Sequence, residues 1–224
     1  PLRYGDRIKL SKNKMFQNIL SLMEQKETNL AISLDYEYFN EILETLKLVG
    51  EHIIIAKIHI DIIKDFSREN IKQLLDLSKK FDFFIFEDRK FSEIGSIFQK
   101  QYLSGMYQIA DWSNLINFHL ISGDSNVKVY QDLYKPESQG GLLVAQMSNR
   151  NNLFTPEYTE KVVRIASEND SVCGFISQEK IAGDNFLYLT PGIMLDSKTD
   201  GLDQGYITPY EAMVNRRCDI IIVG

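Results

Sequence analysis

Three charged residues, Asp88, Lys90 and Glu93, have the types and spacing of a small reaction centre. Asp88 and Lys90 lie two residues apart, and Glu93 follows three residues further on. A carboxylate beside a lysine keeps the lysine protonated and places negative charge next to a departing carboxylate. The lysine can then deliver a proton to the carbon that is left behind. This pattern therefore indicates decarboxylation without a metal or an organic cofactor.

A second charged segment supplies possible partners. Lys57, His59 and Asp61 alternate with isoleucines, so all three share one side if the chain remains extended. Asp35 directly follows an earlier apolar run. Each of these residues alone could be a solvated loop charge in an ordinary ion pair. Taken together with Asp88, they place charges at three successive strand ends and favour a shared pocket.

Eight short apolar runs are predicted to be the strands that position these charges. Several of the intervals between them have helical periodicity, for example residues 39–46 and 71–77, but the interval between the sixth and seventh runs is short and irregular. The runs are 30–34, 53–58, 83–86, 115–119, 142–146, 172–176, 186–189 and 220–223.

Apolar runs without strict alternation are typical of parallel strands that are covered on both faces. Eight of them in a β-α order predict an α/β protein with a (β/α)8 TIM barrel, whose reactive groups lie at the carboxyl ends of the strands. An open, doubly wound sheet is the structural alternative. It is disfavoured because residues 33–37 carry no glycine-rich dinucleotide fingerprint after the first strand.

The chain of 224 residues is predicted to be a single domain, 1–224, in which residues 1–28 form an N-terminal helical extension. The sequence stops at Gly224, directly after the eighth predicted strand. The final helix of a complete barrel is thus missing from this chain, and we expect the natural protein to continue.

Composition excludes several classes of protein. A formal charge of -6 and the lack of any Lys/Arg-rich run argue against a nucleic-acid partner. Cys173 and Cys218 are far apart and form no zinc-binding or disulfide pattern, which fits a reducing compartment. No apolar stretch approaches the roughly 20 residues that span a bilayer. We therefore expect a cytoplasmic protein with no membrane contact and no metal.

Residues 86–95, Phe-Glu-Asp-Arg-Lys-Phe-Ser-Glu-Ile-Gly, resemble the signature of orotidine 5′-monophosphate decarboxylases, Asp-x-Lys-x-x-Asp followed by Ile-Gly. The N-terminal segment resembles the stretch that precedes the decarboxylase domain of bifunctional uridine monophosphate synthases. Further stretches resemble the eukaryotic branch of the family in the same order. They are residues 26–35, 57–61, 101–102, 174–177, 189–192, 204–206 and 219–224.

The resemblance implies catalytic roles for four residues. Lys90 would donate a proton to C6 of the pyrimidine, with Asp88 and Lys57 beside it in the charge network. The family is dimeric, and the second carboxylate of its motif reaches into the neighbouring subunit's site. Glu93 would have that part here, and the protein would be a homodimer that binds orotidine or uridine 5′-monophosphate without a cofactor.

The resemblance also implies a set of substrate-binding residues. These are Asp35, Lys57, His59, Asp61, Ser148, Pro191, Gln204 and Tyr206. The first two would contact the ribose hydroxyls and the next two would support them. Ser148 would face the pyrimidine edge, and Gln204 and Tyr206 would hold the phosphate. Pro191 could instead be part of a structural turn, and Tyr206 could be an ordinary surface residue.

Several residues depart from the family pattern. Glu93 replaces an aspartate, and a misplacement of about 1 Å can reduce a rate on the order of a hundredfold. Ile97 stands where the family has a threonine, so it offers no hydroxyl to a ribose. Gln146 replaces a glutamate, and residues 117–119 read Asn-Phe-His in place of Asn-Ala-His. The phosphate-binding arginine of the family would lie just past Gly224.

Three functions therefore remain open from the sequence. The first is the decarboxylation of orotidine 5′-monophosphate to uridine 5′-monophosphate in de novo pyrimidine synthesis. The second is a catalytically impaired paralogue that acts as a nucleotide-binding or scaffolding protein. The third is another barrel enzyme that acts on a sugar phosphate by proton transfer, which would leave the matches at Ser148 and at residues 204–206 unexplained.

Overall fold

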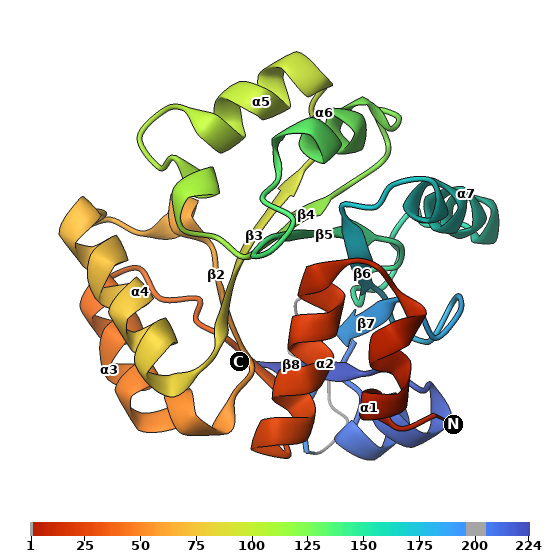
Figure 1. Ribbon diagram of the computed structural model, residues 1–224, viewed down its shortest axis with the longest axis horizontal. Coiled ribbons are helices and arrows are strands. Elements are labelled where there is room, and N and C mark those ends of the chain that lie inside the picture. Colours follow the sequence, from red (N-terminus) through yellow and green to blue (C-terminus); the bar gives the residue numbers. More distant parts are fainter. Residues whose placement is uncertain (1, 196–204) are drawn as a thin grey trace.

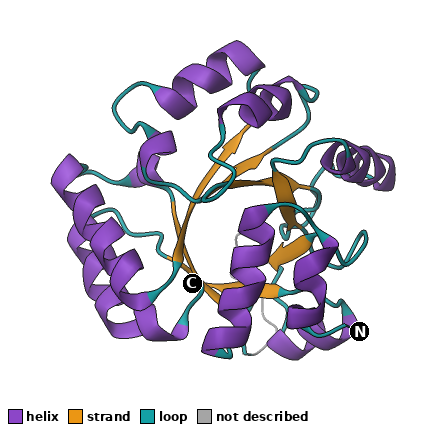
Figure 2. Ribbon diagram, viewed as in Figure 1, coloured by secondary structure: helices purple, strands orange, loops and turns teal. Residues whose placement is uncertain are grey.

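The computed structural model describes residues 2–195 and 205–224. In this part of the chain, eight parallel strands follow one another around a closed barrel, and β1 pairs with β8 to complete it (Figure 2). The expected barrel is thereby confirmed and the open sheet is excluded. The strands are β1 (Leu30–Ser33), β2 (Ile55–Ile58), β3 (Phe84–Phe91), β4 (Leu115–Phe118), β5 (Gly140–Val144), β6 (Val172–Ile176), β7 (Leu187–Thr190) and β8 (Ile220–Val223).

Amphipathic helices surround the barrel and cover its outer face (Figure 1). Helix α3 contains Phe39, Ile42, Leu43 and Leu46 at helical spacing, and all four of these side chains are buried. Between β6 and β7 the described chain contains no helix, in agreement with its irregular sequence. The outer helices are α3 (Phe39–Val49), α4 (Arg68–Phe81), α5 (Gly95–Leu103), α6 (Ser125–Leu133) and α7 (Pro156–Ser167).

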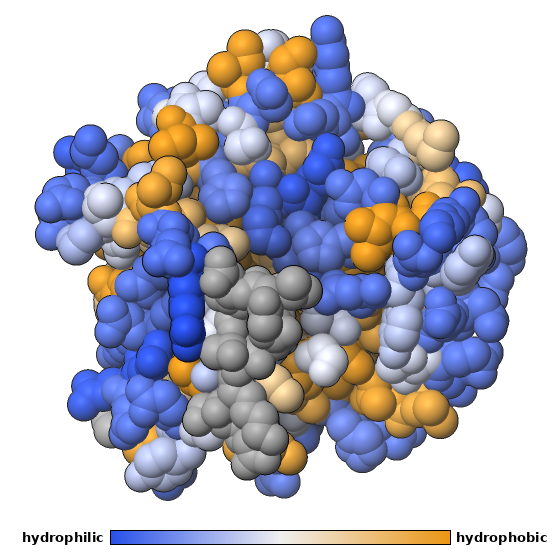
Figure 3. Space-filling view, turned by 180° about the vertical axis from the view of Figure 1, so that it is seen from behind, coloured by the Kyte–Doolittle hydropathy of each residue, from blue (hydrophilic) through white to orange (hydrophobic). Residues whose placement is uncertain are grey.

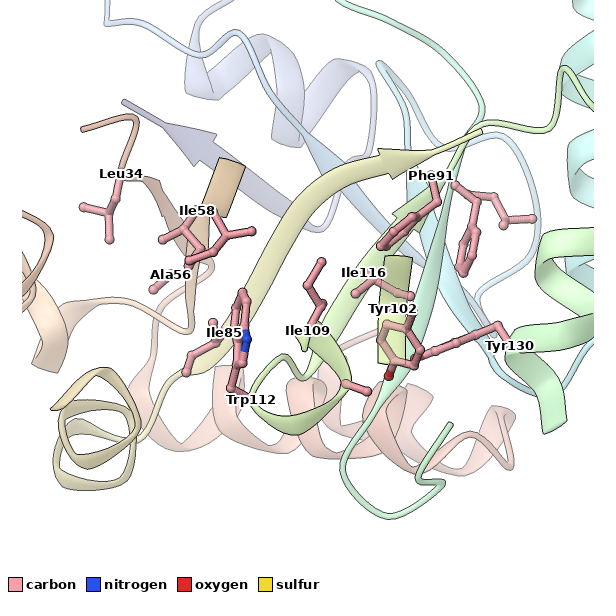
Figure 4. Packing of buried hydrophobic residues seen from close by; sticks show 14 of the residues in the cluster. Leu34, Ala56, Ile58, Ile85, Phe91, Tyr102, Ile109, Trp112, Ile116 and Tyr130 are labelled. Carbon is pink, nitrogen blue, oxygen red and sulfur yellow. The ribbon is translucent and has the colours of Figure 1, made fainter. Parts of the chain in front are cut away.

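The outer core fills the space between the strands and these helices. Residues of β2 and β3 that point away from the barrel axis, such as Ile58 and Ile85, contact side chains from the surrounding segments (Figure 4). Phe91, Tyr102 and Tyr130 extend this layer toward α5 and α6 as an aromatic cluster. The outer core therefore packs the strands against the helices that surround them.

Two N-terminal helices, α1 (Tyr4–Arg7) and α2 (Lys14–Lys26), close one end of the barrel. In Figure 1, α2 crosses in front of the barrel opening. Met15, Phe16 and Ile19 of α2 are fully buried and pack in one cluster with inward-facing residues of the strands. The amino-terminal end of the barrel is therefore filled with apolar side chains.

Strand β3 is longer than its apolar run and irregular where the charges begin. Its pairing with β4 shifts register between Glu87 and Phe91, and Lys90 has a positive φ of 51°. Such a conformation is uncommon for a residue other than glycine and marks a local departure from the extended chain. The sequence predicted that the strand ends at Phe86, because the charged residues that follow carry no apolar strand pattern although they continue the pairing.

Gly95, the last residue of the charged segment, begins α5. A Cβ atom there would lie 2.6 Å from Cγ2 of Val129 and 2.9 Å from the backbone oxygen of Ser125, in α6. Only glycine allows this close approach of α5 to α6. The glycine of the motif thus has a packing role.

Candidate active site

A cavity of about 540 Å³ opens at the carboxyl ends of the strands, opposite to α2. Figure 3 shows this face of the molecule, and hydrophilic residues gather around its centre. Charged side chains lie on one side of the cavity, and apolar residues such as Ile193 and Ile222 lie on another. The predicted site residues among its described lining are Asp35, Lys57, Asp88, Lys90, Ser148, Pro191 and Tyr206.

Asp88 is the centre of the charged side. Its Oδ2 atom lies 3.0 Å from Nζ of Lys57, and its Oδ1 atom lies 2.7 Å from Nζ of Lys90. Asn117 donates a hydrogen bond of 2.7 Å from Nδ2 to the same Oδ1 atom. The spacing of Asp88 and Lys90 in the sequence predicted that they lie together. Closure of the barrel places Lys57 of β2 and Asn117 of β4 beside them.

The environment of Asp88 stabilises its ionised form. Burial alone would raise the pKa of this carboxyl. The hydrogen bond from His59 and the positive charges of the two neighbouring lysines outweigh burial, and they hold the pKa of Asp88 well below its usual range. Asp88 is therefore a carboxylate with a cation on each side. The second of these cations, Lys90, has 27% of its side chain exposed and borders the cavity.

Asn117 belongs to the charged network, although the sequence reasoning did not name it as a site residue. Besides its bond to Asp88, it accepts a hydrogen bond of 2.7 Å from the backbone N–H of Lys90 to its Oδ1 atom. The side chain is fully buried in β4 and fixes both the carboxylate and the irregular backbone of β3. An asparagine within the apolar run Leu-Ile-Asn-Phe was the signal that could have identified it.

Strands β1 and β2 supply the second part of the charged side. Nζ of Lys57 lies 3.4 Å from Oδ1 of Asp35 and 3.1 Å from Nε2 of His59. Ser33 donates a hydrogen bond of 2.8 Å to the other oxygen of Asp35. His59 also lies 3.3 Å from Oδ2 of Asp88, so it contacts the network although it is not among the residues that line the cavity.

Asp61 does not join this network. Strand β2 ends at Ile58 and a 3-10 turn, Ile60–Ile62, follows, so the alternation expected from an extended chain does not persist. The Asp61 carboxylate instead lies 3.1 Å from Arg89 Nη1. Neither residue belongs to the described lining of the cavity, and both side chains are partly exposed.

The opposite side of the cavity comes from the later loops. Ser148 follows β5, and its backbone oxygen accepts a hydrogen bond of 3.3 Å from the N–H of Gly205. This bond brings the neighbouring Tyr206 to the same cavity as Ser148 and Pro191. Gln204 lies outside the described residues.

Glu93 and Ile97 lie apart from the cavity. The Glu93 side chain is exposed, and neither residue belongs to the described lining. Ile94 and Ile97 expose 54% and 39% of their surface. Glu93 is therefore presented at the molecular surface before α5, between the exposed residues Ser92 and Ile94.

No group of three or more His, Cys, Asp or Glu side chains in residues 2–195 and 205–224 is arranged to hold a metal ion. In the same residues, no helix is both long and apolar enough to cross a membrane.

Comparisons with solved structures agree with the barrel. The chain superimposes on the orotidine 5′-monophosphate decarboxylase of Methanocaldococcus jannaschii, solved with the inhibitor BMP, with a TM-score of 0.65 and 18% identity over 88% of this chain and 89% of that one. The decarboxylase of Pyrococcus horikoshii gives a TM-score of 0.64 and 17% identity over 87% and 88%. At these identities the likeness concerns the fold.

Sequence comparisons are more specific. The orotidine 5′-phosphate decarboxylase of Phycomyces blakesleeanus is 41% identical, over 99% of this chain and 84% of that protein. That of Schizosaccharomyces pombe is 39% identical, over 99% and 85%. The uridine 5′-monophosphate synthase of Bos taurus is 41% identical, and the match spans all of this chain and 47% of that protein. The model of the orotidine 5′-phosphate decarboxylase / HUMPS family matches residues 28–224, and the chain belongs to this family.

Proposed function

We propose that this protein decarboxylates orotidine 5′-monophosphate to uridine 5′-monophosphate in pyrimidine synthesis. The observation that carries the proposal is the Asp88 carboxylate, held within 3.0 Å of Lys57 and 2.7 Å of Lys90 at a cavity of suitable size. A fixed negative charge opposite the substrate carboxylate favours its departure, and a fixed ammonium group stabilises the carbanion that forms. The relatives named above carry this activity in their names.

The proposed step balances with the groups of this chain, the substrate and solvent. The bond between C6 and the carboxylate carbon breaks, carbon dioxide leaves, and the electron pair remains on C6. A proton moves from Nζ of Lys90 to C6, and solvent then reprotonates the lysine. No metal or organic cofactor takes part.

The two sides of the cavity suit the two parts of the nucleotide. Asp35 and Lys57 would bind the ribose hydroxyls, with His59 supporting them through its contact with Lys57. On the opposite side, Ser148 would face the pyrimidine edge beside Pro191. Tyr206, together with Gln204, would hold the phosphate. Asp61 would act only indirectly, since its carboxylate pairs with Arg89 and neither residue belongs to the described lining of the cavity.

We propose that the protein works as a homodimer in the cytoplasm. The exposure of Glu93, which lies outside the described lining of its own cavity, supports a role in the site of a second subunit. Two exposed isoleucines, Ile94 and Ile97, lie beside it and would be covered in a dimer. Both cysteines are free and buried, which suits a reducing compartment.

The test is the loss of orotidine monophosphate absorbance with time. We expect the wild type to turn over, and Lys90→Ala to lower kcat by at least about a thousandfold, since it removes the proton donor. Arg89→Ala is the matched control, because it removes the neighbouring cation of β3, and neither Arg89 nor its partner Asp61 belongs to the described lining of the cavity. A Lys90→Ala variant with more than a tenth of the wild-type kcat would exclude the proposed step.

Glu93→Asp separates this function from that of an impaired paralogue. If the wild type is active and the Glu93→Asp variant turns over at a similar rate, the result supports the decarboxylase function. A silent wild type that gains activity on Glu93→Asp would instead indicate the paralogue, which a titration with uridine monophosphate would then test for nucleotide binding. No observation in the described part of the structure favours the paralogue.

A further inference from the structure

Glu87 is a fully buried carboxyl group directly beside the catalytic residues of β3. It precedes Asp88, and its side chain points to the opposite face of the strand, as that of Ile85 does in the outer core. It pairs with Ile58, the last residue of β2, in the register of the sheet. An acidic residue at such a position needs a partner, because an unpaired buried carboxyl is strongly disfavoured.

The partner of Glu87 is the backbone of the turn that follows β2. The N–H of Ile60 donates to both carboxyl oxygens, at 3.0 and 3.2 Å. Ile60 is itself fully buried, so water cannot replace the acceptor. This contact lies at the point where the extended chain of β2 becomes a 3-10 turn.

The position of this turn determines where two site residues lie. His59 directly precedes Ile60, and Lys57 lies two residues earlier in the chain. Both contact Asp88, at 3.3 and 3.0 Å. The ends of β2 and β3 are thus joined on both faces, by ionic contacts toward the cavity and by the Glu87 carboxyl toward the outer core.

We propose that Glu87 is a positioning residue, which holds the end of β2 through the Ile60 N–H and thereby sets the distance of Lys57 and His59 from Asp88. The inference rests on the proposed decarboxylation for its effect on rate. Asn117 fixes β3 against β4 from inside the barrel, and Glu87 fixes β3 against β2 from outside it.

The reach of the side chain matters here, and its charge does not. Burial raises the pKa of Glu87 well above its usual range, and the two carboxyl oxygens accept from the Ile60 N–H. A glutamine has the same length and keeps an oxygen acceptor for the Ile60 N–H. An aspartate keeps the acidic group but is shorter by one methylene, and a leucine fills the space without any acceptor.

The experiment compares Glu87→Gln, Glu87→Asp and Glu87→Leu by kcat and KM, with active sites counted by titration with a tight-binding nucleotide inhibitor. We expect Glu87→Gln to retain kcat within about threefold. Glu87→Asp and Glu87→Leu should lower kcat per active site by about ten- to a hundredfold, because small displacements of reacting groups have effects of this size. The control is Lys64→Gln, in the same loop as Ile60. It removes only an exposed ion pair with Glu37, and it should match the wild type.

A merely structural role would lower the thermal midpoint and leave kcat per active site unchanged, and this result would overturn the proposal. An active Glu87→Asp variant with an impaired Glu87→Gln variant would also overturn it, since charge would then decide. Hydrogen exchange at the Ile60 amide, measured by NMR, gives a reading that does not depend on activity. Protection of this amide that is retained in Glu87→Gln and lost in Glu87→Leu would support the contact. An inactive wild type would refute the proposed function, but it would not change this result.

Discussion

The two ends of the barrel are built on opposite principles. At the amino-terminal end, α2 fills the opening with apolar side chains such as Phe16 and Ile19. At the carboxyl-terminal end, Lys57, Asp88 and Lys90 border an open cavity. Burial of apolar surface stabilises the first end, whereas the second holds charges in positions that a compact core would not tolerate.

Buried charges occur at both ends, but their partners differ. At the closed end, Arg7 forms a bidentate pair with Asp219 and also donates to the backbone oxygen of Phe186 at 2.7 Å. Nζ of Lys26 lies 2.6–3.0 Å from four backbone oxygens, which share its three N–H donors. Arg7 and Lys26 therefore direct their N–H groups to other parts of the same chain. At the open end, Lys90 pairs with the carboxylate of Asp88 and borders a cavity that a substrate can occupy.

The largest effect should come from the open end. Asp88→Asn removes the negative charge between two lysines, so we expect kcat to fall by about ten-thousandfold, equivalent to roughly 5.4 kcal/mol in the barrier. Steady-state rates measured alongside thermal unfolding will separate activity from folding. A variant that is folded and retains a tenth of the activity would show that the charge at this end is not needed for catalysis.

The counterpart at the closed end is Arg7→Met. It leaves Asp219 buried without its cation, and breaking a buried pair in this way lowers the free energy of unfolding by about 3–5 kcal/mol. Urea unfolding measures this loss. We expect kcat per folded molecule to match the wild type, and a large loss of kcat without loss of stability would contradict the division between the two ends.

Lys26→Met tests the same end through neutral partners. Four backbone oxygens lose a charged donor, and some of them are accessible to water, so we expect a loss of about 2 kcal/mol in the free energy of unfolding. The measurement is again urea unfolding at pH 7. An unchanged stability would mean that α2 is held by its apolar face alone.

The last prediction concerns the dependence of stability on pH, which should arise at the open end. The pKa of Glu87 is raised in the folded protein by burial, so its contribution to stability is complete below the unfolded pKa of about 4.5 and is lost as pH rises through the folded pKa. Glu87→Gln does not titrate. Its advantage over the wild type in unfolding free energy should therefore grow above pH 4.5, by about 1.4 kcal/mol for each unit of the raised pKa, and then level off. Urea unfolding at a series of pH values will follow this difference, and a constant difference would contradict a raised pKa.

Much of the fold was predictable because apolar runs record burial directly. The runs at 172–176 and 220–223 match β6 and β8 to the residue. Strand β5 begins at Gly140, two residues before its predicted start, because glycines carry no apolar signal although they pair in the sheet. Strand β3 extends to Phe91 because its pairing continues through an irregular, charged segment.

The site was predictable where its residues are close in sequence. Asp88 and Lys90 were expected together and lie 2.7 Å apart. Asp61 was expected to share a side with Lys57, but the chain turns after Ile58 and carries it to Arg89. The turn leaves the backbone N–H of Ile60 in need of an acceptor. That acceptor, Glu87, lies 27 residues away in the sequence, so local residue patterns do not predict the turn.

The sequence by itself determined the barrel, the charged segment and the family, since all three depend on local residue types and their order. Only the tertiary structure decided that Asn117 and Glu87 join the strand ends around that segment, and that Glu93 lies outside the described lining of its own cavity. The physical reason is that a buried polar group must find a partner in space, and closure of the barrel determines which strands are neighbours. The charged segment of residues 86–95 is therefore encoded locally, but its geometry is set by β2 and β4.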